Sequence, residues 1–223
     1  MRNLIKLLML AIVFSFTSVT FAQSYVVKGG LNLSKIMMRN DEDTFNDQFD
    51  MTPGFHIGVT SEFPIFKEVA FETGLLLSTK GFKRSATVLY GGETKEFKGS
   101  ANLLYLDIPI TVKTYFNIRG TKFYGALGPY IGFGLSGKSK EDCIVNGVIE
   151  SDEKDVNWGT GDSNDLKRLD FGLTAGAGME INTVQIGLSY NFGLANISAN
   201  TEIGQTINNR VLSLSVGYKF GGK

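Results

Sequence analysis

Hydrophobic and polar residues alternate along much of this chain. Residues 104–116 (LYLDIPITVKTYF) place Leu, Leu, Ile, Ile, Val, Thr and Phe at every second position, with Tyr, Asp, Pro, Thr, Lys and Tyr between them. Successive side chains of a β-strand point to opposite faces, so a period of two predicts a strand. This strand is long, and one of its faces carries both a carboxylate and a lysine. Such a strand is poorly suited to the core of a small soluble sheet.

The same pattern recurs along the chain and predicts eight strands. They cover residues 25–34, 55–63, 69–80, 104–116, 123–136, 168–181, 184–192 and 210–220. Alternating segments of about 9 to 11 residues match the length of a tilted β-strand that crosses a bilayer.

The connections between these strands alternate in length. Short turns are expected at residues 64–68, 117–120 and 182–183, whereas the other connections are long and polar. The longest, residues 137–167, holds eight acidic and four basic residues. Outer-membrane barrels have short periplasmic turns and longer extracellular loops. The sequence therefore predicts an all-β fold: an eight-stranded antiparallel transmembrane β-barrel with both termini in the periplasm.

In such a barrel the apolar face of each strand contacts lipid and the polar face lines the lumen. In the 104–116 strand we expect Leu104, Leu106, Ile108, Ile110 and Val112 to face lipid, and Tyr105, Asp107, Thr111 and Lys113 to face inward. Closure of the barrel removes the unpaired strand edges that hydrocarbon does not tolerate. Pro109 lacks the N–H needed for one ladder hydrogen bond, so a local β-bulge is expected there.

The first 22 residues have the features of a secretory signal peptide. Arg2 and Lys6 precede an apolar run at residues 7–16, and small residues stand before the expected cleavage point after Ala22. This pattern predicts export through the Sec pathway, and the run of about ten apolar residues is shorter than the roughly 20 of a transmembrane helix. We expect residues 1–22 to be removed, residues 23–223 to form the barrel domain, and the cell outer membrane to be its location.

Composition narrows the partners and the chemistry. Without Arg2 and Lys6, 20 basic residues stand against 22 acidic ones, which gives no reason to expect a nucleic-acid partner. Cys143 is the single cysteine, so no disulfide is expected within the chain. One histidine and one cysteine do not support a zinc site, and no motif predicts a cofactor.

Five motifs carry a resemblance to a known family: residues 74–83 (GLLLSTKGFK), 103–116 (LLYLDIPITVKTYF), 122–137 (KFYGALGPYIGFGLSG), 170–181 (DFGLTAGAGMEI) and 185–198 (QIGLSYNFGLANIS). With these segments the chain resembles the "porin family" outer-membrane β-barrels of Bacteroidetes-type bacteria, the group that includes PorT-like proteins. The resemblance implies insertion into the outer-membrane bilayer by the barrel-assembly machinery. PorT-like members are associated with type IX secretion and gliding. One departure is that Gly221, Gly222 and Lys223 follow Phe220, where many such barrels end on an aromatic residue.

An eight-stranded barrel has an interior just wide enough to be filled by side chains or to hold one small ligand. Charged residues of both signs occur at its inward positions, and we expect them to pair across the lumen and to fill it, because buried charges are tolerated when they are paired. The residues of this predicted lumen charge network are Lys28, Glu62, Glu72, Asp107, Lys113, Asp170, Glu180 and Lys219.

Candidate chemistry outside this network is sparse. Some small outer-membrane barrels are lipid-modifying enzymes that use a histidine with a serine or an acidic partner, but the chain has no Gly-x-Ser-x-Gly motif and no second histidine. His56 is therefore interpreted as a hydrogen-bonded lumen residue. The acidic stretches 41–50 and 151–155 lack the EF-hand spacing and are interpreted as solvated loops. Trp158 is expected either at the outer membrane interface or at a loop tip that contacts a partner.

These observations favour a non-enzymatic outer-membrane barrel with a filled lumen. Its role would be structural or accessory, in adhesion or in a secretion complex, with a possible protein partner at the extracellular loops. One alternative is porin-like passage of small solutes or ions. Another is a soluble, lipocalin-like carrier of an apolar ligand, which requires the apolar faces of the strands to point inward.

Overall fold

The computed structural model describes residues 23–39, 49–90, 93–145, 148–161, 163–200 and 205–222. The predicted signal peptide lies outside these ranges. None of the described residues forms a helix long and apolar enough to span a membrane. The strands are β1 (Ser24–Arg39), β2 (Phe49–Asp50), β3 (Thr52–Phe66), β4 (Val69–Tyr90), β5 (Glu93–Ile118), β6 (Thr121–Val145), β7 (Val148–Asp155), β8 (Leu169–Ile181), β9 (Val184–Gly193) and β10 (Thr206–Gly221).

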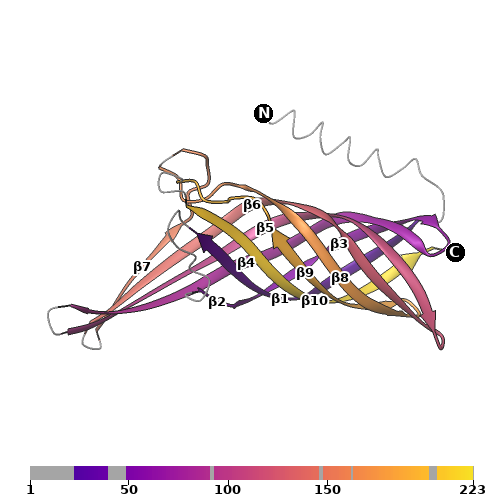
Figure 1. Ribbon diagram of the computed structural model, residues 1–223, viewed down its shortest axis with the longest axis horizontal. Coiled ribbons are helices and arrows are strands. Elements are labelled where there is room, and N and C mark those ends of the chain that lie inside the picture. Colours follow the sequence, from indigo (N-terminus) through magenta and orange to yellow (C-terminus); the bar gives the residue numbers. More distant parts are fainter. Residues whose placement is uncertain are drawn as a thin grey trace.

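Eight of the strands close into a barrel (Figure 1). The order around the ring is β1, β3, β4, β5, β6, β8, β9 and β10, and β10 pairs with β1 to complete it. All of these pairings are antiparallel. The two additional strands lie beside the ring, with β2 paired to β4 and β7 paired to β6. Seven of the eight predicted strands lie within one ring strand each, and the eighth, 168–181, begins one residue before β8, so the predicted fold class is confirmed.

Tight turns join the strands at the end of the barrel where the C-terminus lies (Figure 1). Arg119 and Gly120 connect β5 to β6 with φ values of 50° and 87°, and Asn182 begins the β8–β9 turn with a φ of 54°. Two-residue hairpin turns need positive φ, which glycine and asparagine adopt most readily. The short turns therefore occur where the sequence predicts them.

Two of the predicted long loops are instead largely β-structure. Strands β4 and β5 continue as a hairpin to Tyr90 and Glu93, and β6 continues to Val145 before β7 returns. We call residues 83–90, 93–100, 138–145 and β7 the wing; it projects beyond the barrel (Figure 1). The acidic stretch 151–155, interpreted above as a loop, forms most of β7. Both faces of the wing carry polar residues, so hydrophobic alternation is weak there and the sequence pattern misses these strands.

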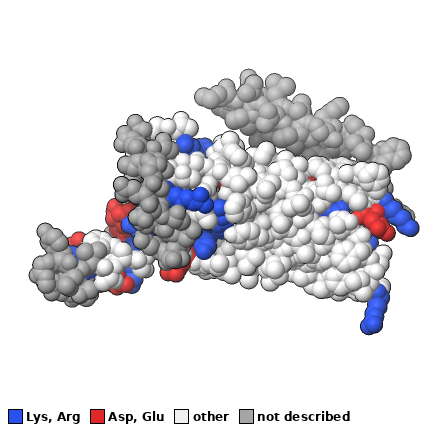
Figure 2. Space-filling view, in the orientation of Figure 1, with Lys and Arg blue, Asp and Glu red and all other residues white. Residues whose placement is uncertain are grey.

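The outer surface of the barrel is apolar. On the face shown in Figure 2, charged side chains gather at the two ends and the middle is almost free of them. Aromatic residues stand near both borders of this apolar band, as they do at the two interfaces of membrane barrels. Exposed examples are Phe66, Phe116 and Phe220 at the periplasmic end and Phe55, Phe133, Phe171 and Phe192 nearer the extracellular end. The soluble carrier alternative is wrong, because the apolar side chains face outward.

The expected bulge at Pro109 is also wrong. The β4–β5 ladder is interrupted between the pairs Thr73–Ile110 and Leu76–Asp107, but both pairs have the same register. The missing N–H of a proline removes a hydrogen bond without adding a residue, and the pairs on either side hold the strand in place. The register shift in this part of the barrel lies elsewhere, where Leu104 and Tyr105 of β5 pair with β6.

Candidate functional site

Charged side chains cross the lumen near its periplasmic end. Lys113 Nζ lies 2.7 Å from Glu62 Oε1 and 2.5 Å from Glu72 Oε2. Lys219 Nζ bridges Glu62 and Glu180 at 2.8 Å and 3.0 Å. A further contact of 3.0 Å joins Lys28 to Glu72. We call this set the periplasmic layer; its residues are Lys28, Glu62, Glu72, Lys113, Glu180 and Lys219.

The periplasmic layer balances three lysines against three glutamates. Additional polar groups support it: the Gln185 amide donates to Glu62 at 3.1 Å and to Glu180 at 2.9 Å. Lys113 Nζ also lies 4.6 Å from the centre of the Tyr124 ring. Paired charges with further hydrogen bonds are the form in which ionised groups are tolerated away from water. The layer can therefore stay charged inside the barrel.

A second group of charges crosses the lumen nearer the extracellular end. The ammonium of Lys80, whose side chain is 0% exposed, lies 2.8 Å from Asp107 Oδ1 and 2.9 Å from Asp170 Oδ2. The Tyr130 hydroxyl and the Asn209 amide also donate to Asp170, at 3.2 Å and 2.9 Å. We call Lys80, Asp107 and Asp170 the extracellular layer.

All eight residues of the predicted lumen charge network point into the barrel, but they do not form one network. Six of them make up the periplasmic layer, whereas Asp107 and Asp170 belong to the extracellular layer. The residue that joins these two aspartates, Lys80, is missing from the predicted set. It lies on the same face of β4 as Glu72 and could have been included from its position in the alternation. That the two layers fill and stabilise the barrel stays a prediction.

A cavity of about 100 Å³ separates the two layers. Its walls include Lys28, Glu72, Asp107 and Lys113 together with many hydroxyl and amide side chains. The buried Thr111 hydroxyl lines this cavity without a hydrogen-bond partner in the protein. A cavity of this size with polar groups in its wall has room for water molecules. Side chains therefore do not fill the lumen completely.

His56 lies in the wall of this cavity and is buried. Its Nδ1 atom is 2.8 Å from Asn32 Oδ1 and its Nε2 atom is 2.9 Å from Ser215 Oγ. The sequence places His56 on the inward face but does not identify these partners. Ser215 reaches His56 only because β10 pairs with β1 and closes the barrel, a contact between residues far apart in the chain.

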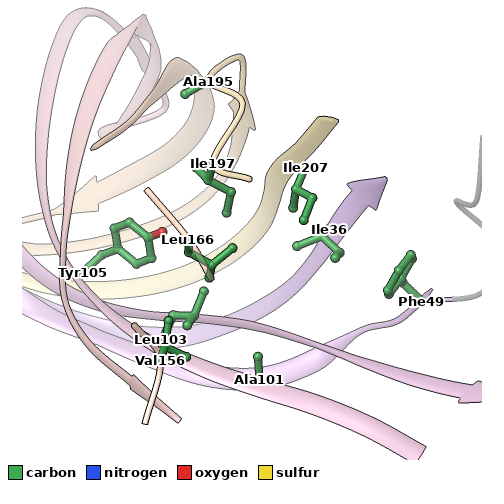
Figure 3. Packing of buried hydrophobic residues seen from close by; sticks show 10 residues of the cluster. All are labelled: Ile36, Phe49, Ala101, Leu103, Tyr105, Val156, Leu166, Ala195, Ile197 and Ile207. Carbon is green, nitrogen blue, oxygen red and sulfur yellow. The ribbon is translucent and has the colours of Figure 1, made fainter. Parts of the chain in front are cut away.

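Apolar side chains close the extracellular mouth of the barrel (Figure 3). Residues 156–161 and 163–168 lie over the mouth together with residues 194–200. A hydrogen bond of 2.8 Å from the Lys167 N–H to the Ile197 carbonyl joins the two parts. We call the buried cluster the mouth plug. It consists of Ile36, Phe49, Ala101, Leu103, Tyr105, Val156, Leu166, Ala195, Ile197 and Ile207.

Trp158 packs against the mouth plug, with its ring centre 5.7 Å from that of Tyr105. The expectation that it stands at the membrane interface or at a loop tip is therefore wrong. It belongs to an inward-folded segment, and burying an indole against other apolar groups is favourable. Within the described residues, no group of three or more His, Cys, Asp or Glu side chains could hold a metal ion. Most of the acidic stretch 41–50 lies outside the described residues.

A closed ring of strands with an apolar exterior and a charged interior defines a transmembrane β-barrel. The family profile of the outer membrane protein beta-barrel domain matches residues 21–199, and the chain belongs to this family. Its location is the outer membrane, as the apolar band and the family together establish. The comparison with curated protein sequences gives no match.

Solved outer-membrane proteins show distant likeness. The attachment invasion locus protein Ail of Yersinia pestis is 17% identical, with a TM-score of 0.33 over 89% of this chain and 98% of that one. OprG from Pseudomonas aeruginosa is 12% identical, with a TM-score of 0.42 over 89% and 96% of the two chains. Neisserial surface protein A is 9% identical, with a TM-score of 0.37 over 90% and 97%. Likeness at this level carries no information about function.

Proposed function

We propose that this protein is a non-conducting outer-membrane barrel with a structural or accessory role at the cell surface. The observation that carries the proposal is the threefold obstruction of the lumen by the periplasmic layer, the extracellular layer and the mouth plug. The role needs no catalysis and no nucleic acid. The bilayer and, during insertion, the barrel-assembly machinery would be its partners, in keeping with the resemblance to PorT-like barrels.

The ion layers oppose the passage of solutes. Lys80, Glu62 and Asp170 are almost completely buried and each is held by contacts of 2.9 Å or less. An ion crossing the lumen would have to separate such pairs and leave a buried charge without a partner, which costs several kcal/mol. The mouth plug adds an apolar barrier above them.

The wing is the surface on which we place an accessory role. It extends the sheet beyond the apolar band, where lipid no longer covers it. Phe97 and Ile149 are 42% and 62% exposed there. We place contact with another protein, in a secretion complex or in adhesion, on this protruding surface because lipid does not cover it.

Conductance measurements test this proposal. The refolded barrel, residues 23–223, is added to a planar bilayer, and heat-modifiable gel mobility serves as the control for folding. We expect a folded barrel that gives no channel openings. Steady ion-selective openings from folded protein would overturn the proposal and establish a conducting pore.

One observation favours a second candidate function, porin-like passage of small solutes. The cavity between the layers has hydroxyl, amide and charged side chains in its wall and could hold a small solute between two barriers. A variant with Val156, Leu166 and Ile197 of the mouth plug changed to Ala separates the candidates. If the intact barrel is silent and the variant conducts, the plug gates a path; a folded, silent variant supports the closed barrel.

A further inference from the structure

The chain of hydrogen bonds through Asn32, His56 and Ser215 has no part in the proposed surface role. The three residues come from β1, β3 and β10, which are neighbours in the ring. Gly30 of β1 stands directly between the other two strands, paired with His56 on one side and with Ser215 on the other. A Cβ atom at Gly30 would lie 2.8 Å from His56 Cε1. The absence of a side chain at Gly30 therefore lets the imidazole reach the serine across an intervening strand.

The orientation of Asn32 determines which histidine nitrogen carries the proton. The Asn32 amide nitrogen donates to Ser78 Oγ and to the carbonyls of Phe55 and Thr79, at 3.0, 3.2 and 3.0 Å. Its oxygen therefore faces His56 and, as a pure acceptor, accepts a hydrogen bond from Nδ1–H. Nε2 of the neutral imidazole is then an acceptor, so the Ser215 hydroxyl must donate to it.

This arrangement is that of a nucleophile with its general base. A serine hydroxyl that donates to an imidazole, whose other nitrogen is held by a third group, loses its proton readily when it attacks an electrophile. His56 and Ser215 both line the cavity between the ion layers, so the attacking oxygen has space beside it. Asn32 acts through His56 and is a positioning residue.

We propose that Ser215 is an activated nucleophile that accepts a small acyl group from an ester in the lumen cavity. Ser215 Oγ forms a bond to the ester carbonyl carbon while His56 Nε2 takes the hydroxyl proton. The bond from that carbon to the alcohol oxygen then breaks, and His56 returns the proton to the departing alcohol. Ser215 is left as an ester. This modification is independent of the surface role of the wing.

The cavity restricts the substrate in size and in direction of entry. With about 100 Å³ available, the cavity admits a short acyl group such as acetyl and excludes a long acyl chain. Lys28 lines the cavity, and its side chain is still 14% exposed. The periplasmic layer therefore covers the cavity less completely than the extracellular layer, whose Lys80 side chain is 0% exposed, and a small ester would enter from the periplasmic side.

Covalent labelling with methanesulfonyl fluoride tests the reactivity of Ser215. The folded barrel in detergent is treated with the reagent and mapped by peptide mass spectrometry. Ser215 Oγ bonds to sulfur, fluoride leaves, and His56 takes the proton. We expect one adduct, at Ser215, and with vinyl acetate an acetyl group at the same residue.

Variants separate an activated serine from a merely structural one. Ser215→Ala abolishes the adduct, and His56→Gln slows its formation about 100-fold, as loss of a general base does. Ser189 lines the same cavity, and both nitrogens of His56 are already bonded elsewhere, so Ser189→Ala is the matched control and labels normally. Asn32→Ala slows labelling and Asn32→Asp restores it, since a carboxylate oxygen also accepts from Nδ1.

Three results would each overturn the proposal: no adduct on folded protein, an adduct spread over several cavity serines, or an unchanged rate in His56→Gln. If His56→Gln does not fold, the adduct map of the unmodified chain and the labelling rates of Asn32→Ala and Asn32→Asp still test whether Ser215 is activated. The conductance of the barrel is read separately, so an open pore would refute the surface role without affecting this result.

Discussion

The lumen and the wing both contain ion pairs between a lysine and a carboxylate, but in different surroundings. Lys80 of the extracellular layer and Lys138 of the wing contact carboxylates at 2.8 Å and 2.6 Å, but their side chains are 0% and 66% exposed. Water and salt screen the wing pair, whereas burial shields the lumen pair from both. Pairs at similar distances therefore contribute very differently to stability, and burial decides which pairs matter.

Removal of the Lys80 charge should have the largest effect. In Lys80→Met, Asp107 and Asp170 are left buried and facing each other without a cation. We expect the free energy of unfolding to fall by about 3–5 kcal/mol. Urea titration in lipid vesicles, read by heat-modifiable gel mobility, measures it. Neutralising both aspartates as well, with Asn at each position, should recover part of the loss; no recovery would argue that packing of the lysine stem was responsible.

Lys113→Met should have a smaller effect, although Lys113 is also buried. Its partners Glu62 and Glu72 keep contacts with Lys219 and Lys28. We expect a lower unfolding temperature and a loss of about 2–3 kcal/mol, less than for a pair left without any cation. An unchanged unfolding temperature would contradict the role given to the periplasmic layer.

Trp158→Ala tests whether the mouth plug contributes through packing. The indole is only partly buried, so we expect a loss of about 2 kcal/mol, below the 3–5 kcal/mol typical of a fully buried tryptophan. Trp158→Phe keeps an aromatic ring against Tyr105 and should lose less. Equal losses for the two variants would show that the ring contact is unimportant.

Lys138→Met completes the comparison and should leave stability unchanged. Lys138 donates a hydrogen bond to Glu153 and holds the pKa of that carboxyl below its usual value. Without the lysine, the pKa of Glu153 rises toward the ordinary value, which an NMR titration detects. A large change in unfolding would show that the wing pair is not screened as its exposure implies.

Local features of this protein follow from its sequence, whereas contacts between distant strands do not. The alternation in residues 104–116 predicts both the strand and its lipid-facing side, because side-chain direction in a strand is a local property. The wing was missed where both faces are polar, and the expected bulge at Pro109 was wrong because neighbouring pairs hold the register. Asp107 and Asp170 were expected with the other charges, yet they meet Lys80 instead, and which charges meet depends on the pairing of four separate strands.

The sequence by itself determined that this chain forms an eight-stranded membrane barrel with charges inside. The alternation of apolar and polar residues, the turn residues and the segment lengths all depend on residues that are consecutive in the chain. The tertiary structure alone decided that the charges divide into two layers with a cavity between them, and that Asn32, His56 and Ser215 lie in contact. The physical reason is closure. A barrel brings together the first and last strands, and the height at which each inward side chain meets its neighbours is set by the register of every pair around the ring.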